Sequence, residues 1–406
     1  MSATAAAGLP YATALLPAAQ AALPDYLRDL AHLVSIDSGS YSPRGVNQVA
    51  DWLQERLGRT GFTTERIASP PTSEGQAFGD TLVARKPGRV RCADGGRRIL
   101  LAGHMDTVFS DGTAQERPFS LAGSMAYGPG VSDDKGGLLA GIAAVEILHQ
   151  AGLEDFAEIV FLATPDEEVG SPASRPVTEA VADGMHHALA LECARENGDL
   201  VIARKGVADF RITVTGRAAH AGIEPERGAN AALAAAHLTV ALQELNWAWE
   251  DVTVNVGVIR AGTRANIVCP EAELRVEVRA VTLTDIRRAE DAITRAAAKP
   301  GVPGTHVTVE RLDLCTPMED TTASRDMFHQ ARSAARAVGL DIGAAATGGV
   351  GDANFIAGTG VPVLDGLGPV GGADHSPQEW LDTTTVAPRT ALLASLIASL
   401  GNSRPR

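Results

Sequence analysis

The stretch RRILLAGHMD at residues 97–106 is a short apolar run that ends in a histidine and an aspartate. Two further apolar runs also end in acidic residues, IVFLATPDEE at 159–168 and ALALE at 188–192. A helical stretch, KGGLLAGIAAVEIL, begins at residue 135, between the first run and the second. Continuous apolar strands that alternate with helices are typical of a parallel sheet covered on both faces. The sequence therefore predicts an α/β domain with a mainly parallel sheet. Its polar residues would lie at the carboxyl ends of the strands, where open α/β sheets bind ligands.

The segment 207–313 follows a different pattern, in which apolar and polar residues alternate as in strands with one wet face. The alternating runs and a last expected strand lie near 210–215, 252–258, 274–278 and 306–312. Helical stretches follow the first and third of these, the second helix with Thr284 as its expected N-cap. The order βαββαβ is typical of the ferredoxin-like motif. We therefore expect an inserted α+β ferredoxin-like domain at 207–313, with 1–206 and 314–406 forming one discontinuous domain.

The composition describes an acidic globular protein. The chain has 406 residues, of which 49 are acidic and 35 basic, giving a net charge of −14. Its length suffices for two domains with their own cores. Because a chain this acidic has no electrostatic attraction to phosphate backbones or anionic membranes, we expect neither nucleic acid nor membrane as a partner.

Three features favour a cytoplasmic location. The first 20 residues lack the basic segment of a secretory signal. No run approaches the ~20 apolar residues of a membrane-spanning helix. The four cysteines, Cys92, Cys193, Cys269 and Cys315, are scattered rather than paired as in a disulfide framework.

Carboxylate and imidazole side chains gather in five short segments, at 103–106, 132–135, 166–168, 192 and 374–376. Histidine nitrogen and carboxylate oxygen together suit zinc, manganese or cobalt. Residues two apart on a strand point the same way, so Asp106 can hydrogen-bond the second ring nitrogen of a metal-bound His104. Asp133, after a Gly-Pro-Gly turn, can bridge two cations.

Glu167 and Glu168 are neighbours, and on an extended segment they would face opposite ways. Burying both without a cation is costly, so one as ligand and the other as general base is the simplest division. Taken singly, each motif also has an ordinary structural interpretation as a strand residue, a helix cap, a solvated face or a loop histidine. Their joint position at strand ends favours a site.

Eight motifs follow one another in an order that resembles a known family. They are GHMDTV (103–108), GPGVSDDKGG (128–137), TPDEEVGS (164–171), LEC (191–193), AAHAG (218–222), RANIVCP (264–270), TGGVGDANF (347–355) and ADHSPQEWLD (373–382). From about residue 30 to the end, the chain resembles the co-catalytic zinc exopeptidases, the family of glutamate carboxypeptidase, aminoacylase, acetylornithine deacetylase and succinyl-diaminopimelate desuccinylase. The glutamate carboxypeptidase branch is the most similar.

The resemblance implies two zinc ions, with manganese or cobalt as possible substitutes, and assigns their ligands. His104 and Glu192 would bind one ion, His375 and Glu168 the other, and Asp133 would bridge them. Glu167 would be the general base and proton shuttle, and Asp106 would orient His104. The family also often has a cis peptide after the bridging aspartate, here Asp133–Asp134.

For the inserted domain, the resemblance implies a lid and dimerisation role, and hence a homodimer. His220 would reach the partner's active site and stabilise the oxyanion, while Asn266 and Arg279 would bind the terminal carboxylate of the substrate. Two ordinary alternatives stay open, a solvated strand face for Arg279 and a surface position for His220.

The expected function is a di-metal hydrolase that cleaves an amide or peptide bond next to a carboxylate-bearing amino acid. Its substrate would be a small peptide or an N-acyl amino acid, and the enzyme a carboxypeptidase, a dipeptidase or an N-acyl-amino-acid amidohydrolase. Lys205 is offset from the lysine of glutamate-specific members, and Cys193 stands where many members have proline, so glutamate specificity is not implied.

Two alternative functions fit the sequence less well. A carbamoyl or allantoate-type amidohydrolase usually has histidine where Glu192 stands. A catalytically silent dimeric binding protein would lack a ligand or the base, and this sequence lacks neither.

Overall fold

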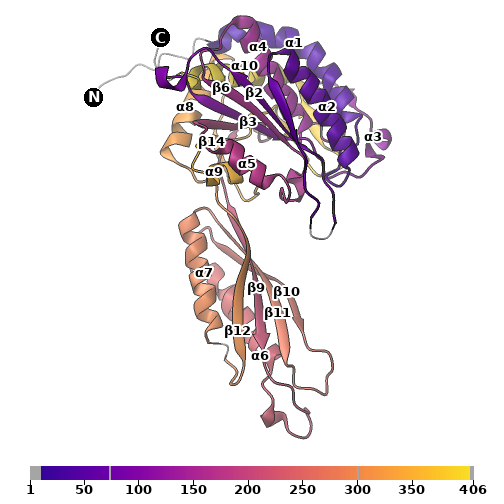
Figure 1. Cartoon of the computed structure of the whole chain (residues 1–406), viewed down its shortest axis with the longest axis vertical. Helices are drawn as coiled ribbons and strands as arrows, with labels where there is room; N and C mark the ends of the chain where they lie inside the picture. The colour runs from indigo at the N-terminus through magenta and orange to yellow at the C-terminus, as the bar shows by residue number, and fades with distance from the viewer. Residues whose placement is uncertain (1–10, 73–74, 300, 403–406) are drawn as a thin grey trace, which may run out of the picture. The chain divides into compact units, whose positions relative to one another are not determined.

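The computed structural model describes residues 11–72, 75–299 and 301–402 (Figure 1). The chain divides into two compact units. The first unit comprises Met1–Ile202, Asp320–Ala346 and Gly351–Arg406, and the second comprises Ala203–Glu319 and Thr347–Val350. The prediction that a signal peptide is lacking concerns the first 20 residues, of which 1–10 lie outside the described residues.

A six-stranded sheet in the order β1-β2-β6-β3-β7-β14 forms the centre of the first unit. β3 (Arg98–His104) pairs in parallel with β6 (Glu158–Thr164) and with β7 (His187–Ala190), and β14 (Val363–Leu364) continues the parallel part beside β7. β2 and β1 extend the sheet as antiparallel strands on the β6 side. The predicted mainly parallel sheet is confirmed, with its three apolar runs as adjacent strands.

Helices cover this sheet, and a small antiparallel sheet, ordered β15-β16-β5-β4, accompanies it. The remaining strands of the unit are β1 (Thr63–Ile67), β2 (Thr81–Pro87), β4 (Ser120–Ala122), β5 (Met125–Tyr127), β15 (Gly371–Gly372) and β16 (Trp380–Asp382). Its helices are α1 (Tyr11–Val34), α2 (Pro43–Arg59), α3 (Thr113–Glu116), α4 (Lys135–Ala151), α5 (Arg175–Ala182), α8 (Thr322–Ala337), α9 (Asp352–Gly358) and α10 (Thr383–Leu400). The chain passes between the units within β8 (Leu200–Arg204) and β13 (Ala344–Thr347), and also between Glu319 and Asp320 and between Val350 and Gly351. Among the described helices, none is both long and apolar enough to cross a bilayer.

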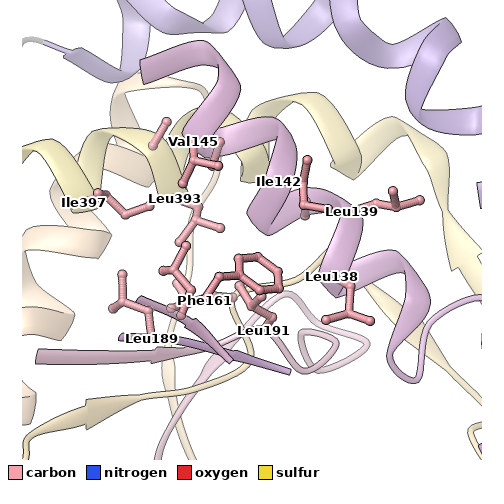
Figure 2. Close-up of a cluster of buried hydrophobic side chains, with 14 of the residues drawn as sticks. Leu138, Leu139, Ile142, Val145, Phe161, Leu189, Leu191, Leu393 and Ile397 are labelled. Carbon is pink, nitrogen blue, oxygen red and sulfur yellow. The ribbon is translucent and has the colours of Figure 1, made fainter. Parts of the chain in front are cut away.

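The core of the first unit lies between α4, α10 and the sheet, where Leu138, Phe161 and Leu393 are fully buried (Figure 2). α4 is apolar on nearly every side, as expected for a helix covered by other elements. Gly137 on this helix permits a close approach, because a Cβ there would lie 1.9 Å from the backbone oxygen of Leu191. The start of α4, which directly follows Asp133 and Asp134, is thereby fixed against the segment that leaves β7.

The second unit has the ferredoxin-like order of elements. Its strands are β9 (Gly206–Thr215), β10 (Thr253–Ala261), β11 (Glu271–Ala280) and β12 (His306–Cys315), and its helices are α6 (Ala231–Gln243) and α7 (Leu283–Ala297). The strands form one antiparallel sheet in the order β10-β11-β9-β12, which confirms the predicted βαββαβ fold. The expected N-cap of the second helix was wrong: Thr282, not Thr284, caps α7, and its side chain accepts a hydrogen bond from Asp285 N.

His187, the first residue of β7, makes the stability of the fold depend on pH. Burial, and then the positive charges of His186 and Arg97, lower the pKa of His187 from 6.5 to about 4. The unfolded chain therefore takes up a proton first as the pH falls, and the native state loses stability between about pH 6.5 and pH 4. We expect His187→Phe to remove this loss. The variant should gain about 2 kcal/mol in free energy of unfolding relative to wild type between pH 7.5 and pH 4.5.

Urea unfolding curves at the two pH values measure this difference. His306→Phe, at an exposed position of β12, is the control for loss of a histidine. A constant difference between His187→Phe and wild type at both pH values would contradict the expectation.

Candidate metal centre

The residues predicted as metal ligands lie at one edge of the central sheet. His104 ends β3, and Glu192 lies two residues beyond β7. Glu167 and Glu168 follow β6 in a 3₁₀ turn, Glu167–Val169, rather than on the extended segment that the sequence suggested. Because β3, β6 and β7 run parallel, their carboxyl ends meet at the same edge.

Asp133 lies between two histidines from distant parts of the chain. Its Oδ1 is 2.8 Å from His104 Nε2, and its Oδ2 is 3.3 Å from His375 Nε2. Each histidine has a second carboxylate nearby: Glu192 Oε1 is 3.7 Å from His104 Nε2, and Glu168 Oε2 is 2.9 Å from His375 Nε2. The arrangement is thus two imidazoles and two glutamates around one shared aspartate. The Asp133–Asp134 peptide bond is cis, as expected from the resemblance.

Asp106 is fully buried and connects the end of β3 to the turn that carries the two glutamates. Its carboxylate lies 3.3 Å from His104 Nδ1 and accepts hydrogen bonds from the backbone amides of Glu167 (3.1 Å) and Glu168 (3.2 Å). Ser40 Oγ donates a further bond of 2.7 Å to it. His104 Nδ1 also lies 3.0 Å from the backbone oxygen of Asp106, which leaves Nε2 facing Asp133. Asp106 therefore fixes both the imidazole and the glutamate turn.

Negative charge dominates this edge of the sheet. Burial raises the pKa of Glu167 well above its ordinary value, and the carboxylates of Glu192 and Asp352 raise it further. Hydrogen bonds to Asp133 and Glu168 raise the pKa of His375 to about 11. Without another cation, these carboxylates would thus hold a proton on the imidazole. A divalent cation meets the same demand for positive charge and displaces such protons when it binds.

The donor atoms fit a metal centre. One ligand atom each from His104, Glu167 and Glu192 lies within 4.8 Å of the others, and so do atoms of His104, Asp133 and Glu168. Imidazole nitrogens with carboxylate oxygens are the donor set of zinc and of the neighbouring divalent metals. Because Glu167 lies as close as the other glutamates, distance alone does not distinguish a ligand from a base at that position.

Glu379 is a buried residue of the site that the sequence analysis did not single out. Its carboxylate accepts hydrogen bonds from the backbone amides of Gly130 (2.8 Å), Ser132 (2.9 Å) and Asp133 (3.1 Å). Burial raises its pKa to about 7, although these three bonds oppose the shift. Glu379 therefore holds the turn from which Asp133 projects. Its place four residues after His375, within a quoted motif, was the one available signal.

Asp352 and Asp134 were also not predicted. Asp352 is buried and accepts bonds of 2.6 Å from Thr164 Oγ1 and from Ser171 Oγ, so it spans the turn that carries the glutamates. Asp134 is fully buried, and its Oδ2 lies 3.4 Å from His104 N. Both residues lie within quoted motifs, yet their contacts are tertiary and leave no periodic signal.

The three predicted residues of the second unit do not gather at one place. Ala221 N donates to Asn266 O (3.1 Å) and His220 pairs with Ile267 in a β-bridge, so exposed His220 and Asn266 are neighbours. Arg279 is at the other end of β11, about 27 Å from its first residue at roughly 3.4 Å per residue. Its guanidinium donates to Glu277 Oε1 (2.7 Å) and to Gly348 O (2.9 Å).

Comparisons with known proteins identify relatives of this chain. Residues 100–399 match the family described as Peptidase family M20/M25/M40. Carboxypeptidase G2 of Pseudomonas sp. (strain RS-16) is 30% identical over 390 residues, which are 95% of this chain and 92% of that protein. An acetylornithine deacetylase of Myxococcus xanthus is 30% identical over 276 residues, 64% of this chain and 68% of that protein.

Solved structures agree on the fold. The aminopeptidase PepT of Bacillus cereus superposes with a TM-score of 0.74 at 22% identity, over 93% of this chain and 98% of that one. An M20 family metallo-carboxypeptidase of Sulfolobus solfataricus gives a TM-score of 0.66 at 15% identity, over 92% and 98%. The family matches most of this chain, and carboxypeptidase G2 aligns with nearly all of it. The chain therefore belongs to the peptidase family M20/M25/M40 and is a metal-binding hydrolase of peptide or amide bonds.

Proposed function

We propose that this hydrolase is a di-zinc carboxypeptidase, dipeptidase or N-acyl-amino-acid amidohydrolase that cleaves the bond next to an amino acid with a free carboxylate. The observation that carries the proposal is the placement of the two Asp133 oxygens, one beside each histidine ring. In this proposal His104 and Glu192 hold one ion, His375 and Glu168 hold the other, and manganese or cobalt could occupy the same donors.

A bound zinc pair would supply Lewis acidity toward the scissile carbonyl and toward the attacking water. In our proposal the chain itself supplies orientation and proton transfer. Asp106 keeps Nε2 of His104 directed at the centre, and Glu379 keeps Asp133 in place between the two histidines. Their buried hydrogen bonds make the donor set rigid before substrate arrives.

Glu167 is the proposed general base. It would take a proton from the attacking water and pass it to the nitrogen of the leaving amine. Burial and neighbouring carboxylates favour its protonated form, a property that a proton shuttle needs halfway through the reaction. The two hydrogen bonds from the turn to Asp106 fix the backbone from which this carboxylate projects.

We further propose that the enzyme is a homodimer and that the second unit completes the partner's site. His220 would stabilise the oxyanion, and Asn266 and Arg279 would bind the substrate carboxylate. The separation of His220 and Asn266 from Arg279 along β11 supports contributions to two different sites. Arg279 pairs with Val207 and donates to Gly348, close to the points where the chain enters and leaves this unit.

Exposed apolar residues of the second unit suit such an interface. β10 is an edge strand of its sheet, and Ile259 on it is 51% exposed. Leu233 and Val240, seven residues apart on the same side of α6, are 49% and 61% exposed. Edge strands and exposed apolar helix faces are surfaces through which chains associate.

A cytoplasmic location is also part of the proposal. All four cysteines, each in the described part of the chain, are free thiols, as expected in a reducing compartment.

We expect Glu167→Gln to lower kcat by about 10³-fold, because general acid–base catalysis is worth roughly 10²–10⁴-fold. Release of free amino acid from N-acyl amino acids and dipeptides, by enzyme loaded with zinc, measures the loss. Zinc content should stay that of wild type, since Glu167 is proposed as base and not as ligand. Glu65→Gln, an exposed glutamate on β1, is the matched control. Undiminished turnover by the Glu167 variant would exclude this role.

Glu379→Gln should weaken zinc binding by roughly 10–100-fold, as loss of an outer partner of a metal ligand commonly does. The amide keeps the shape of the side chain but turns an NH₂ group toward the backbone amides of the Asp133 turn. Competition with a chromophoric chelator measures zinc affinity directly. Gln378→Ala, at the exposed neighbouring position, should bind zinc like wild type. Equal affinity in both variants would show that Glu379 does not support the centre.

The double variant Val240→Asp/Ile259→Asp should be monomeric. Two charges placed at these exposed apolar positions of the second unit would be buried without partners in the proposed dimer. Light scattering after size exclusion should give wild type twice the chain mass of 42.1 kDa. The variant should have the mass of one chain. Leu121→Asp, on β4 of the first unit, should leave the mass of wild type. A monomeric wild type at micromolar concentration would contradict the proposed dimer.

A further inference from the structure

A cleft beside Glu168 has a lining unlike that of the metal centre. Its volume is about 570 Å³, and its walls are residues 39–42 and 107–111, with Glu168 and Val169 at one side. All of these residues belong to the first unit. Because Glu168 is shared, the cleft adjoins the proposed reaction centre directly.

The surface available in this cleft is largely apolar. Tyr41 and Val108 are 62% and 41% exposed, so both side chains present apolar surface to the cleft. Tyr41 lies against the buried ring of Phe78, with ring centroids 5.9 Å apart. Phe109 lies under the guanidinium of Arg117, 4.4 Å from the ring centre. The aromatic walls are therefore supported from behind.

The two walls are fixed to each other before anything binds. Ser40 N donates to Thr107 O (3.2 Å), and Thr107 N donates to Ser38 O (2.9 Å). A Cβ at Gly39 would lie 2.3 Å from the backbone oxygen of Phe109, so only glycine permits this approach. Ser40 also donates to Asp106, which ties the cleft wall to the carboxylate that orients His104. A rigid cleft of this kind binds an apolar group without the entropic cost of ordering its walls.

The lining of this cleft favours an uncharged group over the anionic part of the substrate. The charged side chains among its lining residues, all within the described part of the chain, are Asp111 and Glu168, and no lining residue is basic. Glu168 is already paired with His375, 2.9 Å away, so a carboxylate placed here would find no lining residue to form a salt bridge with. The carboxylate-bearing amino acid therefore fits better on the other side of the cleaved bond.

We infer that this cleft binds the acyl side of the substrate and selects an uncharged apolar group, a medium-length aliphatic or an aromatic acyl. This inference rests on the proposed function and adds the substrate class to it. A side chain of four to seven carbons would cover the exposed parts of Tyr41, Val108 and Phe109.

The test compares N-acetyl, N-butanoyl, N-hexanoyl, N-benzoyl and N-succinyl forms of one amino acid, once with alanine and once with glutamate. We expect kcat/KM of the zinc-loaded wild type to rise by at least about 30-fold from acetyl to hexanoyl, given about fourfold per buried methylene at best. Benzoyl should match hexanoyl, and succinyl should fall below butanoyl. Val108→Trp, which narrows the cleft, should reduce the hexanoyl-to-acetyl ratio at least tenfold, and Tyr41→Ala should reduce it as well. Leu121→Trp, on exposed β4, should keep the ratio of wild type.

Binding of the same compounds to zinc-loaded Glu167→Gln, by calorimetry, separates this inference from the proposed function. Affinity that rises with acyl size in Glu167→Gln, and does not rise in Glu167→Gln/Val108→Trp, supports the cleft. If wild type nevertheless hydrolyses none of the compounds, the proposed function alone is overturned. Hydrolysis with the same kcat/KM for every acyl group, or with succinyl preferred, would overturn the cleft and leave the function standing. If no compound is hydrolysed and the affinity does not change with acyl size, both the cleft and the proposed function are overturned.

Discussion

The constraint on which the rest of the first unit depends is the concentration of carboxylates at one edge of its sheet. Asp133, Glu167, Glu168 and Glu192 converge there with two imidazoles, and like charges so close are tolerated only with positive charge between them. Much of the surrounding structure serves to keep them there. Asp106 and Glu379 accept backbone hydrogen bonds from the segments that carry these groups, and Gly137 lets α4 approach the strand that leads to Glu192.

The strand order of the central sheet determines which side chains meet at the carboxylate cluster. β3 lies between β6 and β7, so His104 at its end is flanked by two strands that are each followed within a few residues by glutamates. His104 is consequently the common member of both groups of potential ligands. The proposed second metal position depends on a different source, the loop after β15, in which His375 has a positive φ of 61°. One half of the centre thus follows from regular sheet geometry, and the other half from loop geometry.

Much of the fold could be predicted from the sequence because its signals are local. The apolar runs ending at His104, Thr164 and Glu192 became adjacent parallel strands, and the alternation in 207–313 became a βαββαβ sheet. The proposed ligands came from motifs whose order resembles a family, and the structure brings them together. Glu379 and Asp352 could not be found this way, because their partners are distant in sequence and a buried acceptor of backbone amides leaves no pattern. The small sheet of β4, β5, β15 and β16 was missed for a related reason, since strands of two or three residues are too short to show a period.

The location of the second unit within the chain has a consequence for biosynthesis. His104, Asp133, Glu168 and Glu192 all precede Ala203, whereas His375 and Glu379 follow the inserted segment. A nascent chain that has just emerged with the insert still lacks α10, which packs on α4 and α1 in the core of the first unit. It also lacks His375 and the carboxylate of Glu379 that holds the Asp133 turn. The first unit can therefore complete its core and its carboxylate cluster only after the whole insert has been synthesised.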